Sequence, residues 1–585
     1  MKYFNISKIY TGAEILFETF EYLNINEVFG YPGGAAIPLY DELTRRKKTI
    51  KHYLTAHEQG AIHSAEGYAK SNEKLGVVFT TSGPGATNIT TGLANAYADS
   101  TPILAITSNV NSKLIGTNAF QEVNICKIAN TITKNAYFVN DVKDLQQTLF
   151  KAFKEATTGR CGPVLVDITT DVYKDKCELK DFEQLENEFT KTTKTENKIY
   201  NFLELLDEIS KAQKPIFYCG GGIKSNCFDV LYKIVKLTNF PIATTMNGLG
   251  VYPAYEKENL QMLGMHGTYE ANMSLYNCDL MIVIGARFDD RVTCALSKFS
   301  PNSKKIHVDI DSKELNKLVK VDYPINMDCY DFLNQFYEVL KENKKKIPNI
   351  NKWWKQIEKW REVKSYVYKQ EKGKKNRKAK IKPQYLLDTL NKIVVEKSKL
   401  NKRTFIATDV GQHQVWTSQY LKFNDKRNFI TSGGLGTMGF GLPSAIGAQI
   451  ANKKDSVVLI TGDGSFIMTM HEMATIKRYK IPVKIIVVNN TKLGMVKQWQ
   501  ELFYHKNYSE IDLESGNPNF VKNAKSFGIK AKRLTKVKNV ERALRKLLRA
   551  KKPYLLEVFV DPKENVYPMI PVGKGHNEII LNQDC

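Results

Sequence analysis

The sequence predicts an α/β protein built from three doubly wound parallel-sheet domains. Its 585 residues correspond to about three or four domains at roughly 100–200 residues each. Short apolar runs rich in β-branched residues recur along the chain, and each is followed by a glycine turn and a helical pattern. Strands that are buried on both faces have this composition, and their alternation with helices indicates parallel sheets.

The predicted strands divide into three groups in chain order. The first group is Gly76–Thr81, Ile103–Thr107 and Val164–Ile168; the second is Ile216–Cys219, Leu280–Ile284 and Ile306–Ile310; the third is Val457–Ile460 and Val483–Val488. A capped amphipathic helix is predicted to begin at Thr11, directly after Met1–Tyr10. Since no cleavable targeting segment precedes it, we expect the protein to remain where it is made, in a bacterial cytoplasm or an organelle stroma.

Two composition shifts mark the expected domain boundaries. Residues Lys174–Lys198 are polar and charged, and Lys344–Pro383 are Lys-rich with a Trp-Trp pair, which is typical of a helix followed by a linker. The predicted divisions are an N-terminal domain at 1–180, a central domain at 190–345, a basic helix and linker at 346–383, a third domain at 384–560, and a tail at 561–585. The tail is punctuated by Pro and Gly, and we expect it to lie over another surface.

The composition is that of a globular protein with a large positive charge. Hydrophobic residues make up 42% and charged residues 25%, and no stretch approaches the ~18 apolar residues of a membrane span, which excludes an integral membrane protein. The net charge of +24 leaves a nucleic-acid-binding protein as an alternative. Because the lysines are spread along the chain, we interpret the charge as codon bias and the one cluster, Glu371–Lys382, as a solvated linker. The nine cysteines form no CxxC pair, which favours free thiols in a reducing compartment over disulfides or a zinc site.

The strongest chemical signal follows two predicted strands of the third domain. Val457–Ile460 runs into Thr461-Gly462-Asp463-Gly464-Ser465-Phe466 and a helical pattern, and Val483–Val488 ends in Asn489-Asn490-Thr491-Lys492. Neighbouring parallel strands deliver both turns to one carboxyl edge, where open α/β sheets bind ligands. The glycines let the backbone approach a phosphate at a helix N-terminus, and carboxylate, amide and backbone oxygens suit Mg²⁺. Asn490 lies 27 residues after Asp463, and the pair of turns resembles the thiamine diphosphate signature, a GDG followed by NN.

A second glycine motif offers a competing interpretation. Gly434–Gly439 matches GxGxxG, follows the strand-like Asn428–Ser432 and precedes a helix, as in dinucleotide-binding folds. The ribose-binding acid of such a fold should follow about 20 residues later. The acid found there is Asp463, which already belongs to the GDG turn. We therefore favour the diphosphate interpretation and keep a dinucleotide site as the less favoured alternative.

A candidate proton-transfer group lies in the first domain. Glu58, in His57-Glu58-Gln59-Gly60-Ala61, precedes a helix of small and apolar residues, Ile62–Lys70. Partial desolvation there would raise the pKa of the carboxylate; the alternative is a surface glutamate stabilised by the helix dipole. Thiamine diphosphate needs an acid at N1′ of its aminopyrimidine to generate the ylid, and Glu58 is our candidate for that acid.

Together these motifs resemble the catalytic large subunits of the acetolactate synthase (acetohydroxyacid synthase) family. The resemblance covers nearly the whole chain and is carried by Phe29–Gly34, His57–Ala61, Thr81–Asn88, Gly116–Glu122, Gly264–Gly267, Gly285–Arg291, Gly411–Gln414, Gly462–Gly464 and Gly494–Trp499. The GDG and NN turns are general to thiamine diphosphate enzymes, whereas the FQE, GARFDDR and GMVxQW segments separate this family from the decarboxylases.

The resemblance implies a carboligase, a transferase. Pyruvate would be decarboxylated on thiamine diphosphate, and the hydroxyethyl carbanion/enamine would attack a second 2-oxo acid. Pyruvate as acceptor gives 2-acetolactate, and 2-oxobutanoate gives 2-aceto-2-hydroxybutanoate, in the first common step of valine, leucine and isoleucine biosynthesis. The alternative is another thiamine diphosphate-dependent 2-oxo acid decarboxylase or a pyruvate oxidase, which shares the GDG and NN turns and Glu58.

Carried over position by position, the resemblance implies roles for single residues. Catalytic roles fall to Glu58, Gln121 and Lys134; thiamine diphosphate contacts to Glu58, Gln412, His413, Gly436, Met438, Gly464 and Ser465; Mg²⁺ ligation to Asp463, Asn490 and the Lys492 carbonyl; and the substrate pocket to Phe120, Met265, Arg291, Met495 and Trp499. Met438 would wedge the cofactor into a bent shape. A guanidinium fork at Arg291 suits the carboxylate of the second oxo acid, and an indole wall at Trp499 suits an ethyl group over a methyl.

The central domain resembles the FAD domain of the family, in which the flavin is structural and takes no part in redox chemistry. The implied flavin contacts are Arg160, Gly220, Gly221, Gly222, Thr245, Met246, His266, Gly267, Thr268, Gly285, Ala286, Arg287, Asp309, Ile310 and Asp328. The departures from the family pattern are Asn111 for Pro, Asn135 for His, Asn247 for an apolar residue or Gly, and Met327 for Gly. Asn247 bears on the flavin geometry, and Asn111 bears on inhibitor sensitivity more than on catalysis.

The resemblance also implies an assembly. In this superfamily the first domain of one chain faces the third domain of its partner, so Glu58 and Asp463 should serve one site from two subunits of a homodimer or a dimer of dimers. A small regulatory subunit is a candidate partner, and nucleic acid and membranes are not expected. The absent transit peptide and the Lys/Asn-rich bias favour a plastid (chloroplast) stroma, with a bacterial cytoplasm as the alternative.

Overall fold

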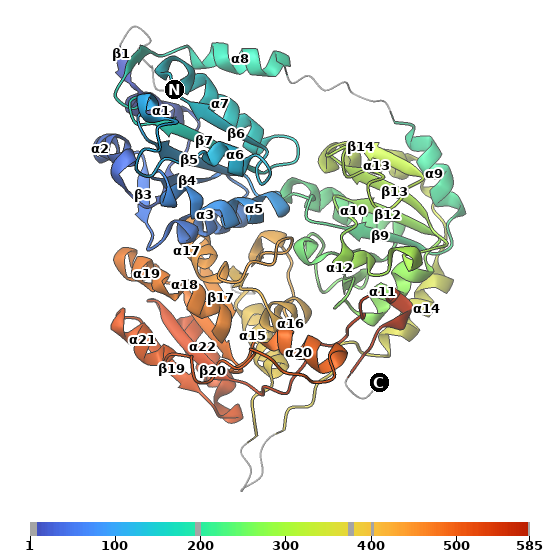
Figure 1. Cartoon of the computed structure of the whole chain (residues 1–585). Coiled ribbons are helices and arrows are strands. Elements are labelled where there is room, and N and C mark those ends of the chain that lie inside the picture. Colours follow the sequence, from blue (N-terminus) through green and yellow to red (C-terminus); the bar gives the residue numbers. More distant parts are fainter. Residues whose placement is uncertain (1–8, 193–199, 372–378, 399–402, 583–585) are drawn as a thin grey trace.

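The computed structural model describes residues 9–192, 200–371, 379–398 and 403–582. It contains three six-stranded sheets, covered by helices, in which all neighbouring strands are parallel (Figure 1). This confirms the predicted α/β class, and each predicted strand coincides with an observed one. Parts of the two polar boundary segments, residues 193–199 and 372–378, lie outside the described residues.

The first sheet has the strand order β3-β2-β4-β5-β7-β6. Its strands are β2 Glu27–Gly30, β3 Lys51–Leu54, β4 Gly76–Thr80, β5 Ile103–Asn109, β6 Asn135–Val139 and β7 Pro163–Thr169. The helices of this domain are α1 Gly12–Tyr22, α2 Ile37–Arg45, α3 Glu58–Asn72, α4 Pro84–Thr87, α5 Thr90–Ala98, α6 Ile125–Ala129, α7 Val142–Thr157 and α8 Phe182–Thr192. A short antiparallel pair, β1 Ile9–Thr11 with β8 Lys176–Glu178, joins the beginning of this domain to its end.

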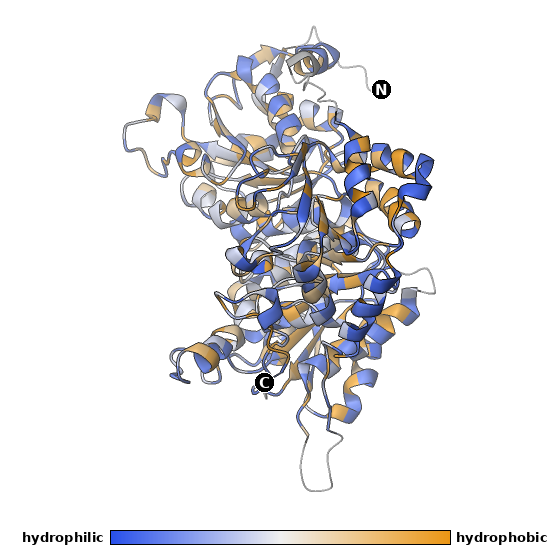
Figure 2. Ribbon diagram, turned by 90° about the vertical axis from the view of Figure 1, so that its right-hand side faces the viewer, coloured by the Kyte–Doolittle hydropathy of each residue, from blue (hydrophilic) through white to orange (hydrophobic). Residues whose placement is uncertain are grey.

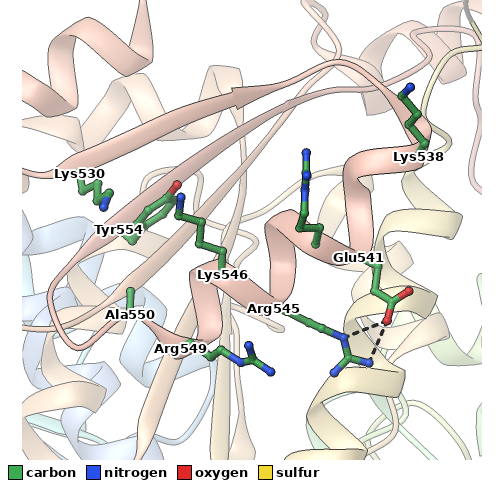
Figure 3. Close-up of a pocket in the computed structure, with 9 residues that line it drawn as sticks. Lys530, Lys538, Glu541, Arg545, Lys546, Arg549, Ala550 and Tyr554 are labelled. Atoms are coloured by element: carbon green, nitrogen blue, oxygen red, sulfur yellow. Dashed lines mark hydrogen bonds and ion pairs between the residues drawn. The ribbon is translucent and has the colours of Figure 1, made fainter.

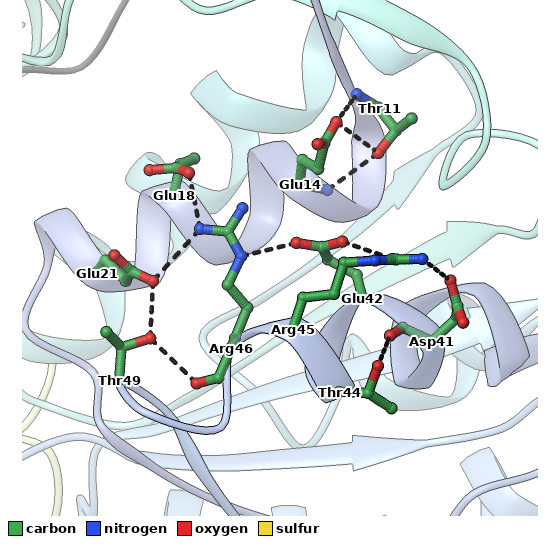
Figure 4. Close-up of polar contacts among 10 residues, drawn as sticks. All are labelled: Thr11, Glu14, Glu18, Glu21, Asp41, Glu42, Thr44, Arg45, Arg46 and Thr49. Carbon is green, nitrogen blue, oxygen red and sulfur yellow. Dashed lines mark hydrogen bonds and ion pairs between the residues drawn. The ribbon is translucent and has the colours of Figure 1, made fainter.

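Helix α1 begins where the sequence predicts, with Thr11 as its N-cap. The Thr11 side chain accepts a hydrogen bond from the Glu14 amide, and the Glu14 carboxylate accepts one from the Thr11 amide, so two free backbone donors are satisfied (Figure 4). After α2, the guanidinium of Arg46 donates to Glu18 and Glu42 at 2.7 Å each. Burial acts against this charge, yet the hydrogen bonds to Glu42 and Glu18 raise the pKa of Arg46 overall. The cation therefore ties α1 to α2.

The second sheet has the order β11-β10-β9-β12-β13-β14. Its strands are β9 Pro215–Cys219, β10 Ile242–Thr244, β11 Asn259–Met262, β12 Leu280–Ile284, β13 Lys304–Asp309 and β14 Tyr323–Asn326. Its helices are α9 Phe202–Lys211, α10 Phe228–Thr238, α11 Tyr269–Asn277, α12 Asp290–Thr293, α13 Cys329–Glu342 and α14 Asn351–Arg361. Both tryptophans of the predicted Trp-Trp helix, Trp353 and Trp354 in α14, are buried in the core of this domain.

The third sheet has the order β16-β15-β17-β18-β20-β19. Its strands are β15 Thr404–Thr408, β16 Phe429–Ile430, β17 Ser456–Gly462, β18 Lys484–Asn489, β19 Lys530–Leu534 and β20 Tyr554–Phe559. Its helices are α15 Pro383–Ser398, α16 Gln412–Tyr420, α17 Gly441–Ala451, α18 Asp463–Thr469, α19 Met473–Tyr479, α20 Gly494–Phe503, α21 Phe520–Ser526 and α22 Val540–Arg549.

The helical pattern after the GDG turn is interrupted in the structure. A 3-10 turn, Met470–Glu472, separates α18 from α19. The interruption turns the buried carboxylate of Glu472 toward the first domain, where it accepts hydrogen bonds from the amides of Ala56 and His57 at 3.1 Å. Hydrophobic periodicity is the same on both sides of the turn, which is why the sequence predicts one continuous helix.

The first and third domains share one hydrophobic core, in which α3 packs along α17. The two helices approach so closely that a Cβ on Gly447 would overlap the carbonyl oxygen of Ser64, and one on Gly67 would overlap that of Ser444. Small residues permit this approach, so α3, which lies on the first sheet, packs directly against α17, which lies on the third.

The C-terminal tail lies over the central domain, as predicted. The amide of Ile570 donates to the Met265 carbonyl at 2.9 Å, and a ring nitrogen of His576 lies 2.8 Å from the Val292 carbonyl. Figure 1 shows the end of the chain beside α11 and α14. Figure 2 shows hydrophobic residues gathered on the strands and on the inner sides of helices. Across the described residues, no helix is both long enough and apolar enough to cross a bilayer.

Candidate active site

The carboxyl edge of the third sheet collects polar side chains from three adjacent strands. Asp409 follows β15, Asp463 follows β17, and Asn489 and Asn490 end and follow β18. Because β15, β17 and β18 are neighbours in the sheet, these side chains meet at one edge, which is where open parallel sheets bind ligands.

Asp463 is nearly inaccessible to solvent and begins α18. Its residue exposure is 1%, and its Oδ2 accepts a hydrogen bond from the side-chain amide of Asn517 at 2.7 Å. Burial raises the pKa of this carboxyl to about 6, against the opposing hydrogen bond from Asn517. The hydrogen-bond partners of this buried carboxylate are all neutral amides, and a cation at this position would compensate its charge.

The turn after β18 brings a second oxygen donor to the same edge. The Asn490 side-chain oxygen accepts from the amide of Lys492 at 3.0 Å, and Thr491 between them has a left-handed φ of 59°. A Cβ on Gly494 would lie 2.7 Å from the Asn490 amide nitrogen and would overlap the side-chain oxygen of Gln412. The glycine is therefore needed for the close approach of this turn to α16. The ammonium group of Lys492 is paired with Asp512, so only its backbone faces the turn.

The oxygen atoms of Asp463, Asn490 and the Lys492 carbonyl suit a hard cation that also binds water or ligand oxygens. One carboxylate, one amide oxygen and one backbone carbonyl are oxygen donors of the kind that Mg²⁺ takes. Within the described residues, no group of three or more His, Cys, Asp or Glu side chains is placed to hold a metal. A divalent ion at this edge would therefore need oxygens from a ligand such as a diphosphate, together with water.

The start of α16 contributes a buried imidazole to the edge. His413 is 6% exposed, and burial lowers its pKa to about 3. Its Nε2 is buried and has no hydrogen-bond partner among the described residues. A Cβ on Gly462 would lie 2.9 Å from its Nδ1, so the ring stands against the GDG turn. An unpaired ring nitrogen at that position fits a phosphate-bearing ligand. Ser465 is turned away, because its hydroxyl donates to the Val410 carbonyl at 2.9 Å.

The Gly434–Gly439 loop is held by Asp409, a residue that the sequence analysis missed. The Asp409 carboxylate accepts from the amides of Gly439 and Gly441 at 2.8 and 3.2 Å, and burial raises its pKa to about 6. Gly436 has a left-handed φ of 73°, and a Cβ on Gly464 would lie 3.9 Å from the methyl group of Met438. Met438 therefore lies beside the GDG turn. An acid directly after an apolar β-branched run, Thr404–Thr408, was the available signal for Asp409.

Glu58 is in the first turn of α3, which begins four residues earlier than the predicted Ile62. Its Oε2 accepts a hydrogen bond from Asn88 at 2.9 Å, and its side chain is partly buried. The backbone just before it is bonded to Glu472, which follows α18, whereas Asp463 begins α18. Within one chain Glu58 and Asp463 therefore lie near opposite ends of α18. This helix has seven residues and is about 10 Å long.

The predicted pocket residues of the first domain are divided between two edges of its sheet. Gln121, with a φ of 63°, lies against Gly83, and Phe120 is 88% exposed; both follow β5 at the carboxyl edge. Lys134 precedes β6 at the amino edge, where its ammonium group donates to the Thr158 carbonyl at 2.9 Å beyond the end of α7. The fold of one chain thus separates Lys134 from Gln121.

The other predicted substrate residues lie on two elements that the tail connects. Arg291 is exposed, and its guanidinium lies 3.6 Å from the sulfur of the buried Met265. Met495 and Trp499 lie on α20, and the Trp499 ring packs edge-on against Phe503 at 5.4 Å. The tail runs from α20 to Met265, so it couples the two elements without bringing Arg291 into contact with Trp499.

The predicted flavin residues gather mainly along the carboxyl edge of the second sheet. The turns after β9 and β12 are packed together, since the Gly222 amide donates to the Gly285 carbonyl at 2.8 Å and Gly285 has a φ of 57°. At the same edge, burial raises the pKa of Asp309 to about 6. Other members of the predicted set have structural partners: Thr268 caps α11, Asp328 caps α13, Thr245 bonds Gly248, Ala286 accepts from His307, and His266 bonds the tail.

Two of the predicted flavin residues form hydrogen bonds across the interface between the first and central domains, one from each side. Arg160, from the first domain, donates to Asp311 and Glu314 at 3.2 and 2.9 Å, and Arg287 donates to the Ala98 carbonyl at 2.8 Å. The departure Asn247 also has a partner, because its side-chain amide donates to Asp99 of the first domain at 3.1 Å. The polar side chain of Asn247 therefore has a hydrogen-bond partner across the interface.

Comparisons with known proteins match each domain. Family models described as thiamine pyrophosphate enzyme match residues 10–128 (N-terminal TPP binding domain), 203–336 (central domain) and 409–558 (C-terminal TPP binding domain). The first of these spans Glu58, and the last spans Asp463 and Asn490.

Relatives similar over 85–99% of their own length are all described as acetolactate synthases. The acetolactate synthase large subunit of Buchnera aphidicola subsp. Schizaphis graminum is 42% identical, over 98% of this chain and 99% of its own. The acetolactate synthase isozyme 2 large subunit of Escherichia coli (strain K12) is 41% identical, over 97% and 99%. Acetolactate synthase 1, chloroplastic, of Nicotiana tabacum is 39% identical, over 98% and 85%.

Proposed function

The chain belongs to the acetolactate synthase large-subunit family of thiamine pyrophosphate enzymes, and on this basis we infer that it is a carboligase acting on pyruvate. It removes CO₂ from one pyruvate and joins the remaining two-carbon unit to a second 2-oxo acid. Pyruvate as acceptor gives 2-acetolactate, and 2-oxobutanoate gives 2-aceto-2-hydroxybutanoate. The single observation that carries this proposal is the meeting of Asp463, Asn490 and His413 at one sheet edge, within the matched TPP-binding domain.

Thiamine diphosphate, bound through Mg²⁺, supplies the electron sink for decarboxylation and for the new carbon–carbon bond. We propose that Asp463, Asn490 and the Lys492 carbonyl hold the metal. His413 and Gln412, with the Gly464 and Ser465 backbone, would hold the diphosphate at the N-terminus of α18, where free amides face the ligand. Gly436 and Met438 would hold the aminopyrimidine, and Asp409 would fix their loop.

Glu58 would protonate and deprotonate the aminopyrimidine N1′ of a site completed by a second copy of the chain. Family membership supports this, because the resemblance implies that the first domain of one chain faces the third domain of its partner. The proposed assembly is therefore a homodimer or a dimer of dimers, with the first domain of one subunit serving the third domain of its partner.

The exposed guanidinium of Arg291 would bind the carboxylate of the second 2-oxo acid, since its planar fork matches two oxygens. Trp499 and Met495 would line the space for the acceptor's alkyl group. Gln121 and Phe120 would complete the pocket from the partner subunit, whereas Lys134, at the opposite edge of the same sheet, would not reach that pocket.

We also propose two further binding partners, a flavin and a regulatory subunit. FAD would bind along its carboxyl edge as a structural group, with Gly220–Gly222 and Gly285 giving the backbone room to approach it. We also propose a small regulatory subunit, because the relatives are named large subunits, and a plastid stroma, a location that the name of the tobacco relative supports for that protein.

The test is a product analysis of the purified chain with pyruvate, Mg²⁺ and thiamine diphosphate. We expect 2-acetolactate, detected as acetoin after acid treatment, and a mixture of two products when 2-oxobutanoate competes with pyruvate. Arg291→Gln should reduce ligation more than CO₂ release, whereas Arg403→Gln, which removes an exposed arginine at the amino edge of the third sheet, should change neither. Acetaldehyde as the main product of the unmodified chain would instead identify a simple decarboxylase, and acetyl phosphate formed when inorganic phosphate, FAD and O₂ are supplied would identify an oxidase.

A further inference from the structure

A strongly basic hollow lies on the third domain, away from the candidate active site (Figure 3). Its volume is about 630 Å³, and it is lined by Lys530, Lys538, Glu541, Arg542, Arg545, Lys546, Arg549, Ala550 and Tyr554. Figure 3 shows Lys546 extending toward Tyr554 and Lys530, whereas Arg545 turns toward Glu541. Six of the nine lining residues are cations and one is an acid.

The basic hollow opens at the amino edge of the third sheet. Lys530 and Tyr554 are the first residues of β19 and β20, and they are partners in the strand register. Asp463 and Asn490 follow the carboxyl ends of strands in the same sheet. Since β20 has six residues, or about 20 Å of extended chain, a molecule in the basic hollow would not reach the candidate active site.

Helix α22 presents most of the charge from one face. Its other face, made of Val540, Leu544, Leu547 and Leu548, is buried against the sheet. Arg542 is three and four residues before Arg545 and Lys546, and Arg549 is three and four residues after Lys546 and Arg545. These residues are therefore neighbours on the helix surface, and like charges at this spacing repel one another. An anion bound across them would relieve that repulsion.

Ordinary structural reasons account for only part of this gathering. A lysine on an edge strand, such as Lys530, protects that edge from pairing with another strand. Cations in the last turn of a helix, such as Lys546 and Arg549, are stabilised by the negative end of the helix dipole. Arg542 lies in the first turn of α22 and Lys538 in the 3-10 turn just before it, where the same dipole disfavours a cation. Their presence there points to a charge that the helix itself does not supply.

The cations of the basic hollow are also largely free to bind. Arg545 is the exception, since it is paired with Glu396 and Glu541 at 2.8 and 2.9 Å, and Arg542 donates only to the neutral Asn539. In the part of the chain that the structure describes, Lys530, Lys538, Lys546 and Arg549 have no carboxylate within ion-pair distance.

We propose that the basic hollow binds a compact polyanion with two or more linked phosphate groups, such as a nucleoside triphosphate or free polyphosphate. Arginine forks and lysine ammonium groups both suit phosphate oxygens. The volume is within the range of about 300–1,000 Å³ typical of small-ligand sites, whereas one orthophosphate would leave most of the charge uncompensated. The inference is independent of the proposed activity, because it concerns the opposite edge of the sheet.

The experiment is calorimetric titration of the full chain with tripolyphosphate. Thiamine diphosphate and excess Mg²⁺ are kept saturating, so that the probe neither fills the active site nor strips its metal. The variant Arg542→Gln/Lys546→Gln/Arg549→Gln is compared with Lys344→Gln/Lys345→Gln/Lys352→Gln, which removes equal charge from exposed positions of the central domain. Lys538→Gln, outside the helix, is a second variant if the triple variant folds poorly.

We expect one site per chain in the unmodified protein, with affinity that falls as salt rises. The hollow variant should bind at least tenfold more weakly and Lys538→Gln several-fold more weakly, whereas the control should stay within twofold. Equal affinity for ATP and tripolyphosphate would assign recognition to the phosphate chain, and tighter ATP binding would add the nucleoside; both support the proposal. Absence of binding, equal weakening in the control, or tighter binding of a short RNA than of either probe would overturn it.

Discussion

The side-chain oxygen of Gln498 accepts a hydrogen bond from the side-chain amide of Gln412 at 2.9 Å. Gln498 is completely buried, and it also bonds both backbone groups of Val566, accepting at 2.8 Å and donating at 2.9 Å. One side chain thus joins α16, which carries the proposed diphosphate residues, to α20, which carries Trp499, and to the tail. Every polar atom involved is satisfied only while these three segments are assembled.

Gln498→Leu should loosen this junction. It leaves both backbone groups of Val566 without partners, at about 1–3 kcal/mol for each buried group, and leaves the Gln412 amide with only the longer bond to the Glu564 carbonyl at 3.4 Å. We expect weaker cofactor binding, a higher KM for the second 2-oxo acid, and faster amide hydrogen exchange in residues 565–570. Gln500→Leu, two residues along the same helix and bonded locally to Ser509, is the control. Unchanged exchange in the tail would show that Gln498 does not hold it.

Glu58→Gln should slow deprotonation at C2 of the bound cofactor by at least about 100-fold, since general acid–base groups contribute roughly 10²–10⁴. The substitution keeps the shape of the side chain, so binding of the cofactor should change little. The measurement is hydrogen–deuterium exchange at C2, followed by NMR after acid quench. Glu73→Gln, at the other end of α3 and exposed, should exchange at the native rate. A native rate in Glu58→Gln would remove Glu58 from the role proposed for it.

Asp463→Asn should weaken thiamine diphosphate binding by at least about tenfold at fixed Mg²⁺, because a neutral amide replaces the one carboxylate at the proposed metal position. Asp512→Asn is the matched control, since Asp512 is exposed and pairs with the side chain of Lys492 near the same turn. The measurement is a calorimetric titration at several Mg²⁺ concentrations. An identical dependence on Mg²⁺ in the two variants would argue against Asp463 as a metal ligand.

Gly447→Ala should destabilise the junction of the first and third domains. Alanine favours a helix interior by up to about 1 kcal/mol over glycine, but its Cβ would overlap the Ser64 carbonyl, and overpacking of this kind costs about 1–3 kcal/mol or more. The expected result is a lower urea midpoint. Gly34→Ala, where a new Cβ meets nothing within 4 Å, should leave the midpoint nearly unchanged. Equal midpoints for both variants would contradict the close helix approach.

His576→Gln should flatten the loss of stability in mild acid. Burial lowers the pKa of His576 to about 4, whereas an unfolded histidine titrates near 6.5. Between these values only the unfolded state takes up the proton, so stability is complete above about pH 6.5 and falls as pH decreases toward 4, with a slope of up to about 1.4 kcal/mol per pH unit. Urea midpoints from pH 7.5 to 4.5 measure the slope. An identical slope in the variant would mean that His576 is exposed or already protonated.

Local pattern predicted those parts of the protein that depend on neighbours in the chain. The β-branched runs place the strands, Thr11 and Glu14 place the start of α1, and the two turns at Asp463 and Asn490 follow adjacent parallel strands. Each of these depends on a few consecutive residues or on the rule that parallel strands share an edge, so the sequence by itself determined the fold class and the edge at which the chemistry is expected.

Only the tertiary structure decided contacts between segments hundreds of residues apart. Glu472 breaks the predicted helix to bond the backbone before Glu58, at a separation of more than 400 residues. Asp409, Gln498 and the amino-edge position of Lys134 likewise depend on which elements pack together. Hydrophobic periodicity records that a face is buried and not what it is buried against, and the hydrogen bonds of buried polar side chains are chosen only once those partners are in place.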